Sequence, residues 1–211
     1  MSKVYLSTAY LASIQYYAKL YSFEEVCIES DCNYVKQTFR NRCMIGAANG
    51  AMPLSIPIEK PDSPKCKTRD IRIAEHGNWR HLHWNAISSA YNSTPFFEYY
   101  KDDFIGFYEK KYDFLFDYNE QLREMICSLI DFTPNVSYSH EYQTVVEENA
   151  IDLREKISPK KPFDTWDNEF KAIPYYQVFQ QKHGFLPNLS IIDLLFNMGP
   201  ESLLILRDSS L

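Results

Sequence analysis

The stretch from Val4 to Ile28, VYLSTAYLASIQYYAKLYSFEEVCI, decides the fold. Its ends, residues 4–6 and 26–28, are short apolar runs typical of buried strands. Between them, apolar residues recur at helical spacing from Leu11 to Phe23. A strand, a helix and a second strand in this order open a βαβ unit, whose crossover makes the two strands parallel.

The loop after the first of these strands is the first candidate ligand-binding segment. Open α/β sheets bind ligands at the carboxyl ends of their strands, so we expect Ser7, Thr8 and Tyr10 to lie at such an edge. The chain has neither a G-x-G-x-x-G motif nor a Walker loop, and the sequence therefore does not predict a standard dinucleotide or P-loop site.

Residues 34–58 predict a β-hairpin with Asn49-Gly50 at its turn. Pro53 and Pro57 restrict the returning strand to a sheet edge or to positions that donate no hydrogen bond.

Arg40, Asn41 and Arg42 precede the apolar part of this hairpin. In a strand, the two arginines share one face and Asn41 points to the other. Two guanidinium groups on one face bind a phosphate or a carboxylate well. The alternative is an ordinary pair of exposed surface arginines.

The remaining elements complete an α/β architecture. Apolar spacing predicts one long amphipathic helix from Asp102 to Asp131, a strand at residues 136–140 and a short helix at 152–157. We expect a single domain over residues 1–211. Its small, mainly parallel sheet begins with the βαβ unit and is joined by the hairpin, the long helix and a helical C-terminus.

His83 is a candidate for acid–base chemistry, because imidazole is the side chain most readily placed near a neutral pKa. It lies in a helix predicted to end near Asn92. The alternative role is a hydrogen-bonded histidine between this helix and the core. His81 and His83 point roughly 200° apart on a helix, and without further ligands at suitable spacing they predict no metal site.

The segment at residues 184–200, GFLPNLSIIDLLFNMGP, predicts a short buried helix that Gly199-Pro200 ends. It contains Asn188, Ser190, Asp193 and Asn197, whose side chains need hydrogen-bond partners if they are buried. Ser190 and Asp193 have the spacing of a helix cap. Asp193 is also a candidate base if burial raises its pKa.

Composition limits the classes of partner and compartment. A net charge of −6 and a pI near 5.4 disfavour a general nucleic-acid binder. Local basic residues between Arg40 and Arg80 suit a compact anion, such as the pyrophosphate of a sugar nucleotide, unless they are solvated surface. Five cysteines without C-x-x-C spacing indicate reduced thiols. Since no signal peptide or membrane span is evident, we expect a cytoplasmic protein without stable membrane insertion.

Three blocks of the chain resemble the WbqC-like family of bacterial proteins associated with O-antigen and other surface polysaccharides. The first is Pro187-Asn-Leu-Ser-Ile-Ile-Asp193 with Asn197, similar to the C-terminal signature of the family. The second block runs from Asn33 to Arg42. The third combines Trp79, His83, Tyr91 and Pro95-Phe-Phe97.

The resemblance implies an enzyme of surface-polysaccharide biosynthesis, an acyl or aminoacyl (glycyl) transferase that acts on a nucleotide-linked amino sugar. His83 and Asp193 are then the expected catalytic residues. The expected substrate-binding residues are Arg40, Asn41, Arg42, Asn188, Ser190 and Asn197. The alternative is a non-catalytic sugar-nucleotide-binding or assembly factor of the same pathway. The sequence indicates no particular cofactor, no metal and no oligomeric state.

Overall fold

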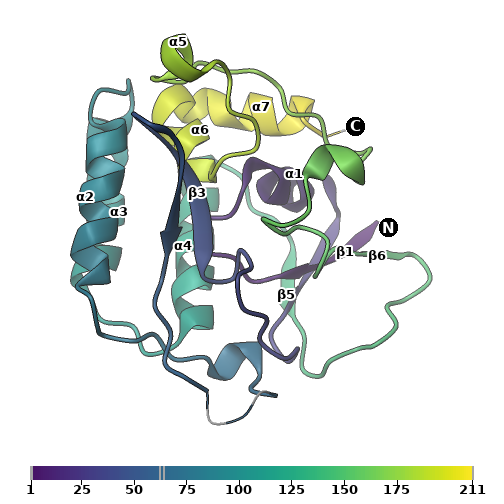
Figure 1. The fold of residues 1–211 in the computed structure, drawn as a ribbon. Coiled ribbons are helices and arrows are strands. Elements are labelled where there is room, and N and C mark those ends of the chain that lie inside the picture. The colour runs from purple at the N-terminus through teal and green to yellow at the C-terminus, as the bar shows by residue number, and fades with distance from the viewer. Residues whose placement is uncertain (1, 62, 64, 211) are drawn as a thin grey trace.

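A four-stranded parallel sheet forms one side of the protein (Figure 1). The computed structural model describes residues 2–61, 63 and 65–210. The strands are β1 (Lys3–Ser7), β2 (Glu25–Glu29), β5 (Val136–Tyr138) and β6 (Ala150–Asp152), in the order β5-β2-β1-β6. All three pairings are parallel, which confirms the expected α/β class and its mainly parallel sheet.

The two central strands are buried on both faces. Val4, Leu6, Val26 and Ile28 have no exposed surface, as expected for continuous apolar runs in a parallel sheet. The crossover between these strands is α1 (Ile14–Ser22), which packs against the C-terminal helices α6 (Ile191–Met198) and α7 (Ser202–Asp208).

The predicted β-hairpin is a separate two-stranded unit. It consists of β3 (Arg42–Ala47) and β4 (Gly50–Ser55), paired antiparallel with Ala47 opposite Gly50. The strands are shorter than expected, and Arg40 lies in the turn before β3. The two arginines are therefore not placed on one face of a strand, as the sequence predicted. The hairpin runs between the α2–α3 pair and the rest of the chain, and β3 contacts both α2 and α6 (Figure 1).

The single helix predicted from Asp102 to Asp131 is wrong in its extent. The structure has two helices, α3 (Phe97–Glu109) and α4 (Leu115–Leu129), after α2 (Trp79–Tyr91). Backbone bonds to the segment near Ile71 separate them: Ile73 N–H donates to Asp113 O at 2.9 Å, and Leu115 N–H donates to Ile71 O at 2.9 Å. Tertiary pairing therefore overrides helical periodicity between them.

The short helix predicted at residues 152–157 is also wrong. Residues 150–152 pair with β1 as β6, and Leu153 N–H still donates to Tyr5 O at 2.9 Å. The chain then forms a loop at the carboxyl end of the sheet. The remaining short elements are the 3₁₀ turns Thr68–Asp70, Phe163–Thr165 and Gly199–Glu201, together with α5 (Gln180–His183).

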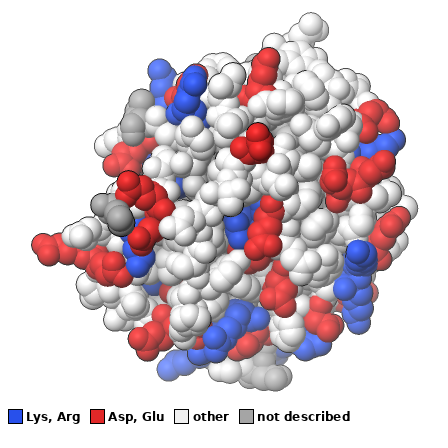
Figure 2. Space-filling view, turned by 180° about the vertical axis from the view of Figure 1, so that it is seen from behind, with Lys and Arg blue, Asp and Glu red and all other residues white. Residues whose placement is uncertain are grey.

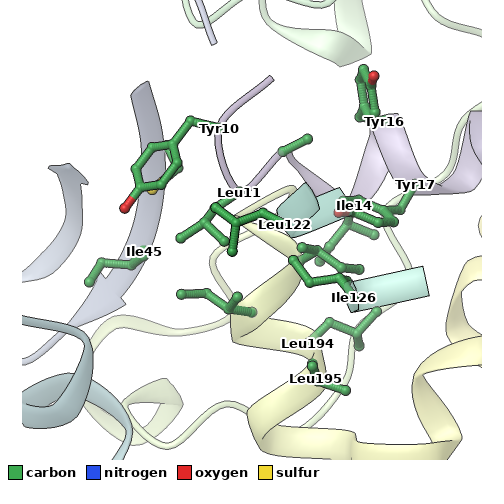
Figure 3. Packing of buried hydrophobic residues seen from close by; sticks show 14 of the residues in the cluster. Tyr10, Leu11, Ile14, Tyr16, Tyr17, Ile45, Leu122, Ile126, Leu194 and Leu195 are labelled. Carbon is green, nitrogen blue, oxygen red and sulfur yellow. The ribbon is translucent and has the colours of Figure 1, made fainter. Parts of the chain in front are cut away.

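Helix α6 lies at the centre of the core. Residues 191–197 of this helix are all buried, as the sequence predicts. Its Leu194 and Leu195 belong to the same buried apolar cluster as Leu122 and Ile126 of α4 (Figure 3). The Phe196 ring contacts three aromatic rings, with centroids 5.2–5.3 Å apart. Across the residues that the structure describes, none of the helices combines the length and apolar character needed to cross a bilayer.

Gly46 sets the closeness of β3 to α6. A Cβ atom at this position would lie 2.8 Å from Asp193 Oδ1 and 3.2 Å from Leu189 Cδ1. A glycine is therefore required for the hairpin to pack this tightly on the helix.

We predict that Gly46→Ala lowers the free energy of unfolding by roughly 1–3 kcal/mol, because the added methyl overpacks this contact. The control is Gly106→Ala in α3, where a Cβ atom meets nothing within 4 Å. This change should stabilise the protein by about 0.5–1 kcal/mol through helix propensity. Urea unfolding of both variants tests the difference, and equal effects would contradict the proposed contact.

Candidate functional site

A narrow pocket lies at the carboxyl ends of β1 and β6. Three segments surround it: the loop after β1 with the first turn of α1, the turn before β3 and the loop after β6. The space inside it that a water-sized sphere can enter is about 10 Å³, room for roughly one water molecule, and the 370 Å³ of empty space around this includes open solvent at the mouth. The polar residues that line it are Ser7, Thr8, Ser13, Tyr16, Thr38, Arg40, Arg154, Glu155 and Ser158. The expectation that the loop after the first strand lies at this edge holds for Ser7 and Thr8.

Arg40 places a buried positive charge in the pocket wall. Only 2% of its surface is exposed. Its Nη2 donates to Ser7 Oγ at 2.7 Å and to Glu155 Oε1 at 2.5 Å. Its Nε has no hydrogen-bond partner within the described part of the chain. A buried guanidinium with an unused donor differs from an ordinary surface arginine, whose donors reach water.

Two residues that line the pocket also carry hydroxyl groups without partners. Ser13 Oγ and Tyr16 Oη are buried and form no hydrogen bond to any described residue. Tyr16 and Tyr17 both belong to the buried apolar cluster (Figure 3), and the charges that act on the Tyr16 hydroxyl are those of Glu120 and Arg123. Unsatisfied buried polar groups are costly, so the unused donor of Arg40 beside this hollow is suited to a polar ligand or an ordered water.

Charged groups at the strand ends support this pocket. Glu29, the last residue of β2, is fully buried and accepts from Arg154 Nη1 at 2.9 Å. It also accepts from the backbone N–H groups of Asp31 at 2.8 Å and Cys32 at 3.1 Å. Burial alone would raise the pKa of Asp152, but its bonds from Arg154 hold that pKa below the usual value. This network fixes the loops around the pocket.

Thr8 joins the pocket to α4. Its hydroxyl donates to Glu120 Oε1 at 2.8 Å, and Arg123 Nε donates to Glu120 Oε2 at 2.8 Å. Burial raises the pKa of Glu120, although the bonds from Arg123 and Thr8 act in the opposite direction. Because its proton is committed to Glu120, the Thr8 hydroxyl can offer a ligand only acceptor lone pairs.

The C-terminal segment builds the loop that walls the pocket. Asn188 Oδ1 accepts from the backbone N–H of Gln15 at 2.8 Å and so caps α1 from a distance. Ser190 Oγ donates to Leu11 O at 2.6 Å. The predicted side-chain cap between Ser190 and Asp193 does not form. Asn188 and Ser190 instead bond to residues at the start of α1 and in the loop before it, far away in the sequence.

Asp193 sits in a separate buried network. Its Oδ1 accepts from Tyr91 Oη at 2.9 Å, and its Oδ2 accepts from Tyr175 Oη at 2.6 Å and Gln177 Nε2 at 2.9 Å. Burial raises the pKa of Asp193, while these hydrogen bonds act to lower it. Asn197 Nδ2 donates to the backbone oxygen of Asp193 at 2.7 Å. Both carboxylate oxygens therefore have internal partners.

His83 lies on α2, against the aromatic core. Its Nδ1 is 2.9 Å from Tyr10 Oη, which is also 2.9 Å from Tyr108 Oη. Burial lowers the pKa of His83 to about 4, so the imidazole is neutral at pH 7. Tyr10, expected beside the ligand edge, turns into this cluster.

The structure separates most of the predicted site residues. Arg40 lines the pocket, and Asn188 and Ser190 support its wall. Asn41 Nδ2 donates to Ile56 O at 2.8 Å, and Arg42 Nε donates to Ser55 Oγ at 3.0 Å, so both hold the hairpin. The roles predicted for His83, Asp193 and Asn197 stay predictions.

Sequence reasoning missed most of the polar residues around the pocket: Ser13, Tyr16, Thr38, Arg154, Glu155 and Ser158 in its lining, and Glu29 behind Arg154. Glu29 had a usable signal, because an acidic residue ending a buried parallel strand points to the ligand edge. Arg154 and Glu155 were hidden by the wrong helix prediction for residues 152–157.

The basic residues of the sequence are largely paired with acids. Arg69 Nη1 contacts Asp31 Oδ2 at 2.9 Å, and Lys67 contacts the other oxygen of Asp31. Arg80 Nη2 contacts Glu75 Oε1 at 2.6 Å. Acidic and basic side chains are interspersed over the face shown in Figure 2. The anion-binding prediction therefore rests on Arg40 and not on a broad basic surface.

Fold and pocket together define an α/β protein with a polar pocket at the carboxyl edge of a parallel sheet. The chain belongs to the WbqC-like protein family, whose model matches residues 8–205. It is also 26% identical over 202 residues to uncharacterized protein Rv1507c of Mycobacterium tuberculosis (strain ATCC 25618 / H37Rv), with 85% of this chain and 86% of that protein covered. No solved structure matches this chain. The resemblance seen in the sequence is thus confirmed at the level of the family.

We predict opposite effects from removing two buried tyrosine hydroxyls. Tyr16→Phe should leave the free energy of unfolding unchanged or raise it by about 1 kcal/mol, because Tyr16 Oη has no described partner to lose. Tyr10→Phe should lower it by roughly 1–3 kcal/mol, because His83 and Tyr108 lose a partner. Urea unfolding measures both values. A marked loss in Tyr16→Phe would contradict the absence of a partner for its hydroxyl among the described residues.

His83 should also make stability depend on pH. Its pKa is about 4 in the folded protein, against an ordinary value of 6.5. As the pH falls, the unfolded chain therefore binds a proton at a higher pH than the folded protein does. The contribution of neutral His83 to stability is complete above pH 6.5 and is lost as the pH falls toward 4. We predict that His83→Gln flattens this part of the profile of unfolding free energy against pH. An unchanged slope would show that other groups cause it.

Proposed function

We propose that this protein is an enzyme of bacterial surface-polysaccharide biosynthesis that transfers an acyl or aminoacyl group to a nucleotide-linked amino sugar. The observation that carries the proposal is the pocket lined by Arg40, Ser13 and Tyr16, each of which has a buried polar atom without a partner in the described chain. In the proposal the protein works in the cytoplasm and Arg40 holds an anionic group of the substrate.

Chemistry of this kind needs an oxyanion stabiliser and a base. Acyl transfer to an amine develops negative charge on the carbonyl oxygen, and preorganised donors stabilise it. In the proposal the Ser13 hydroxyl, which has no partner in the described chain, supplies such a donor while Arg40 holds the anionic group. The sugar amine must also lose a proton. His83 and Asp193 remain the predicted residues for proton transfer, and opening of the pocket toward either one is part of this proposal.

A second function is favoured by the state of Asp193. Both of its oxygens have internal partners, which is the arrangement of a buried structural network. The pocket would then bind a sugar nucleotide without catalysing a transfer, as in a binding or assembly factor of the same pathway. The two functions differ in product: incubation with donor and acceptor gives an acylated amino sugar only in the first.

We predict that a nucleotide-linked amino sugar raises the melting temperature, since a ligand at 100 times its Kd stabilises the folded state by about 2.7 kcal/mol. A thermal-shift screen of nucleotide sugars, acyl-CoA thioesters and aminoacyl donors measures this. Arg40→Lys should weaken the binding of the active compound by about 1.5–3 kcal/mol, because lysine cannot reproduce the guanidinium donors.

Arg72→Lys serves as the matched control for that variant. Arg72 contacts Glu59 and Asp113 on the surface, outside the pocket. Its replacement should leave affinity unchanged. Equal affinities for the wild type and a folded Arg40→Lys variant would remove Arg40 from the binding site, and no response to any compound would contradict the proposed substrate class.

A further inference from the structure

The Arg40 guanidinium uses its donors unevenly. Nη2 contacts Ser7 Oγ at 2.7 Å, Glu155 Oε1 at 2.5 Å and Cys32 Sγ at 3.5 Å. Nε, next to it on the guanidinium, has no partner within residues 2–61, 63 and 65–210. Together Nε and Nη2 can bind both oxygens of one anion in a bidentate pair. In the structure this pair of donors is only half used.

Glu155 is an unusual partner for so deeply buried a charge. Its side chain is 53% exposed, whereas that of Arg40 is 2% exposed. The carboxylate uses one oxygen, so the contact is monodentate. A half-exposed carboxylate regains water when it leaves, which makes its contact with Arg40 easy to exchange for that of another anion.

The backbone around Glu155 is held in place independently of this contact. Ser7 Oγ donates to Arg154 O at 2.7 Å, and Lys161 Nζ donates to Glu155 O at 2.9 Å. Rotation of the Glu155 side chain into solvent therefore breaks neither of these bonds. Such a rotation would uncover Arg40 and enlarge the narrow pocket.

We propose that the Glu155 carboxylate is an internal stand-in for the ligand, occupying an oxyanion position that belongs to a phosphoryl or carboxylate group of the substrate. The incoming anion displaces Glu155 and binds Arg40 through both Nε and Nη2. An anion can bind only when Glu155 has left Arg40, so its apparent affinity is lower when less of the protein is in that open state. Competition from Glu155 therefore selects against anions that bind weakly. This inference rests on the proposed function in taking the same pocket as the ligand site.

The test is a titration with inorganic phosphate and, separately, with acetate at constant ionic strength, followed by thermal shift. Glu155→Gln removes the competing charge and should lower the apparent Kd for phosphate or acetate by roughly tenfold. Glu75→Gln is the matched control, because Glu75 forms an ion pair with Arg80 away from the pocket. It should behave as the wild type.

The role of Arg40 is tested in the same background. In the double variant Arg40→Lys with Glu155→Gln, the gain in affinity should disappear. A second measurement does not depend on the folding of that variant: the Nε–H resonance of Arg40 in Glu155→Gln should shift when the anion is added. Response to phosphate alone assigns a phosphoryl group, and response to acetate alone assigns a carboxylate.

Two results would overturn the inference: Glu155→Gln binds neither anion more tightly than the wild type, or the Arg40 Nε–H resonance does not move. Both are separable from failure of the proposed function. If a nucleotide-linked amino sugar binds but Glu155→Gln does not lower the apparent Kd for either anion, the proposed function is supported and the proposed role of Glu155 is rejected. If Glu155→Gln lowers the apparent Kd but no sugar nucleotide binds, the role of Glu155 is supported and the proposed function is rejected.

Discussion

The docking of residues 188–191 onto the loop after β1 is the contact on which the rest of the structure depends. Ile14 N–H donates to Leu189 O at 3.0 Å, Ile191 N–H donates to Ala12 O at 2.8 Å, and Ser190 N–H donates to Met44 O at 2.7 Å. One short segment thus joins the start of α1, the hairpin and the C-terminal helix. Because the loop after β1 is also a wall of the pocket, this contact shapes the candidate site as well as the core.

Hydrogen bonding distinguishes the Asp193 carboxylate from the residues that line the pocket. Asp193 lies among apolar side chains, yet each of its carboxylate oxygens accepts from a neighbour. Arg40, Ser13 and Tyr16 lie around a hollow, and each has a buried atom without a described partner. A matched network fixes one conformation, whereas unmatched donors beside a hollow are suited to an incoming molecule.

The sequence predicted those parts of the fold that local patterns determine. Apolar runs around Val4 and Val26 predicted parallel strands, and Gly199-Pro200 predicted the end of α6. Patterns failed where distant contacts prevail: pairing with residues near Ile71 divides the expected long helix, and pairing with Tyr5 makes residue 152 part of a strand.

The candidate site was predictable only in part, for the same physical reason. Arg40 was identified from the pattern Arg40-Asn41-Arg42 and from the resemblance of this region to a family motif. Its contact with Glu155, however, depends on a loop 115 positions away in the sequence. The polar signature at Asn188 and Ser190 was correctly expected to need partners. Nothing local in the sequence indicates that those partners belong to α1 and its preceding loop.

The most direct measurement is a crystal structure of the protein with a nucleotide-linked amino sugar bound. The account predicts that an anionic group of this molecule lies against Arg40 Nε and Nη2, that a polar atom of the ligand contacts Ser13 or Tyr16, and that Glu155 has turned toward solvent. A ligand bound at another place, with Glu155 still on Arg40 and the pocket unchanged, would contradict it.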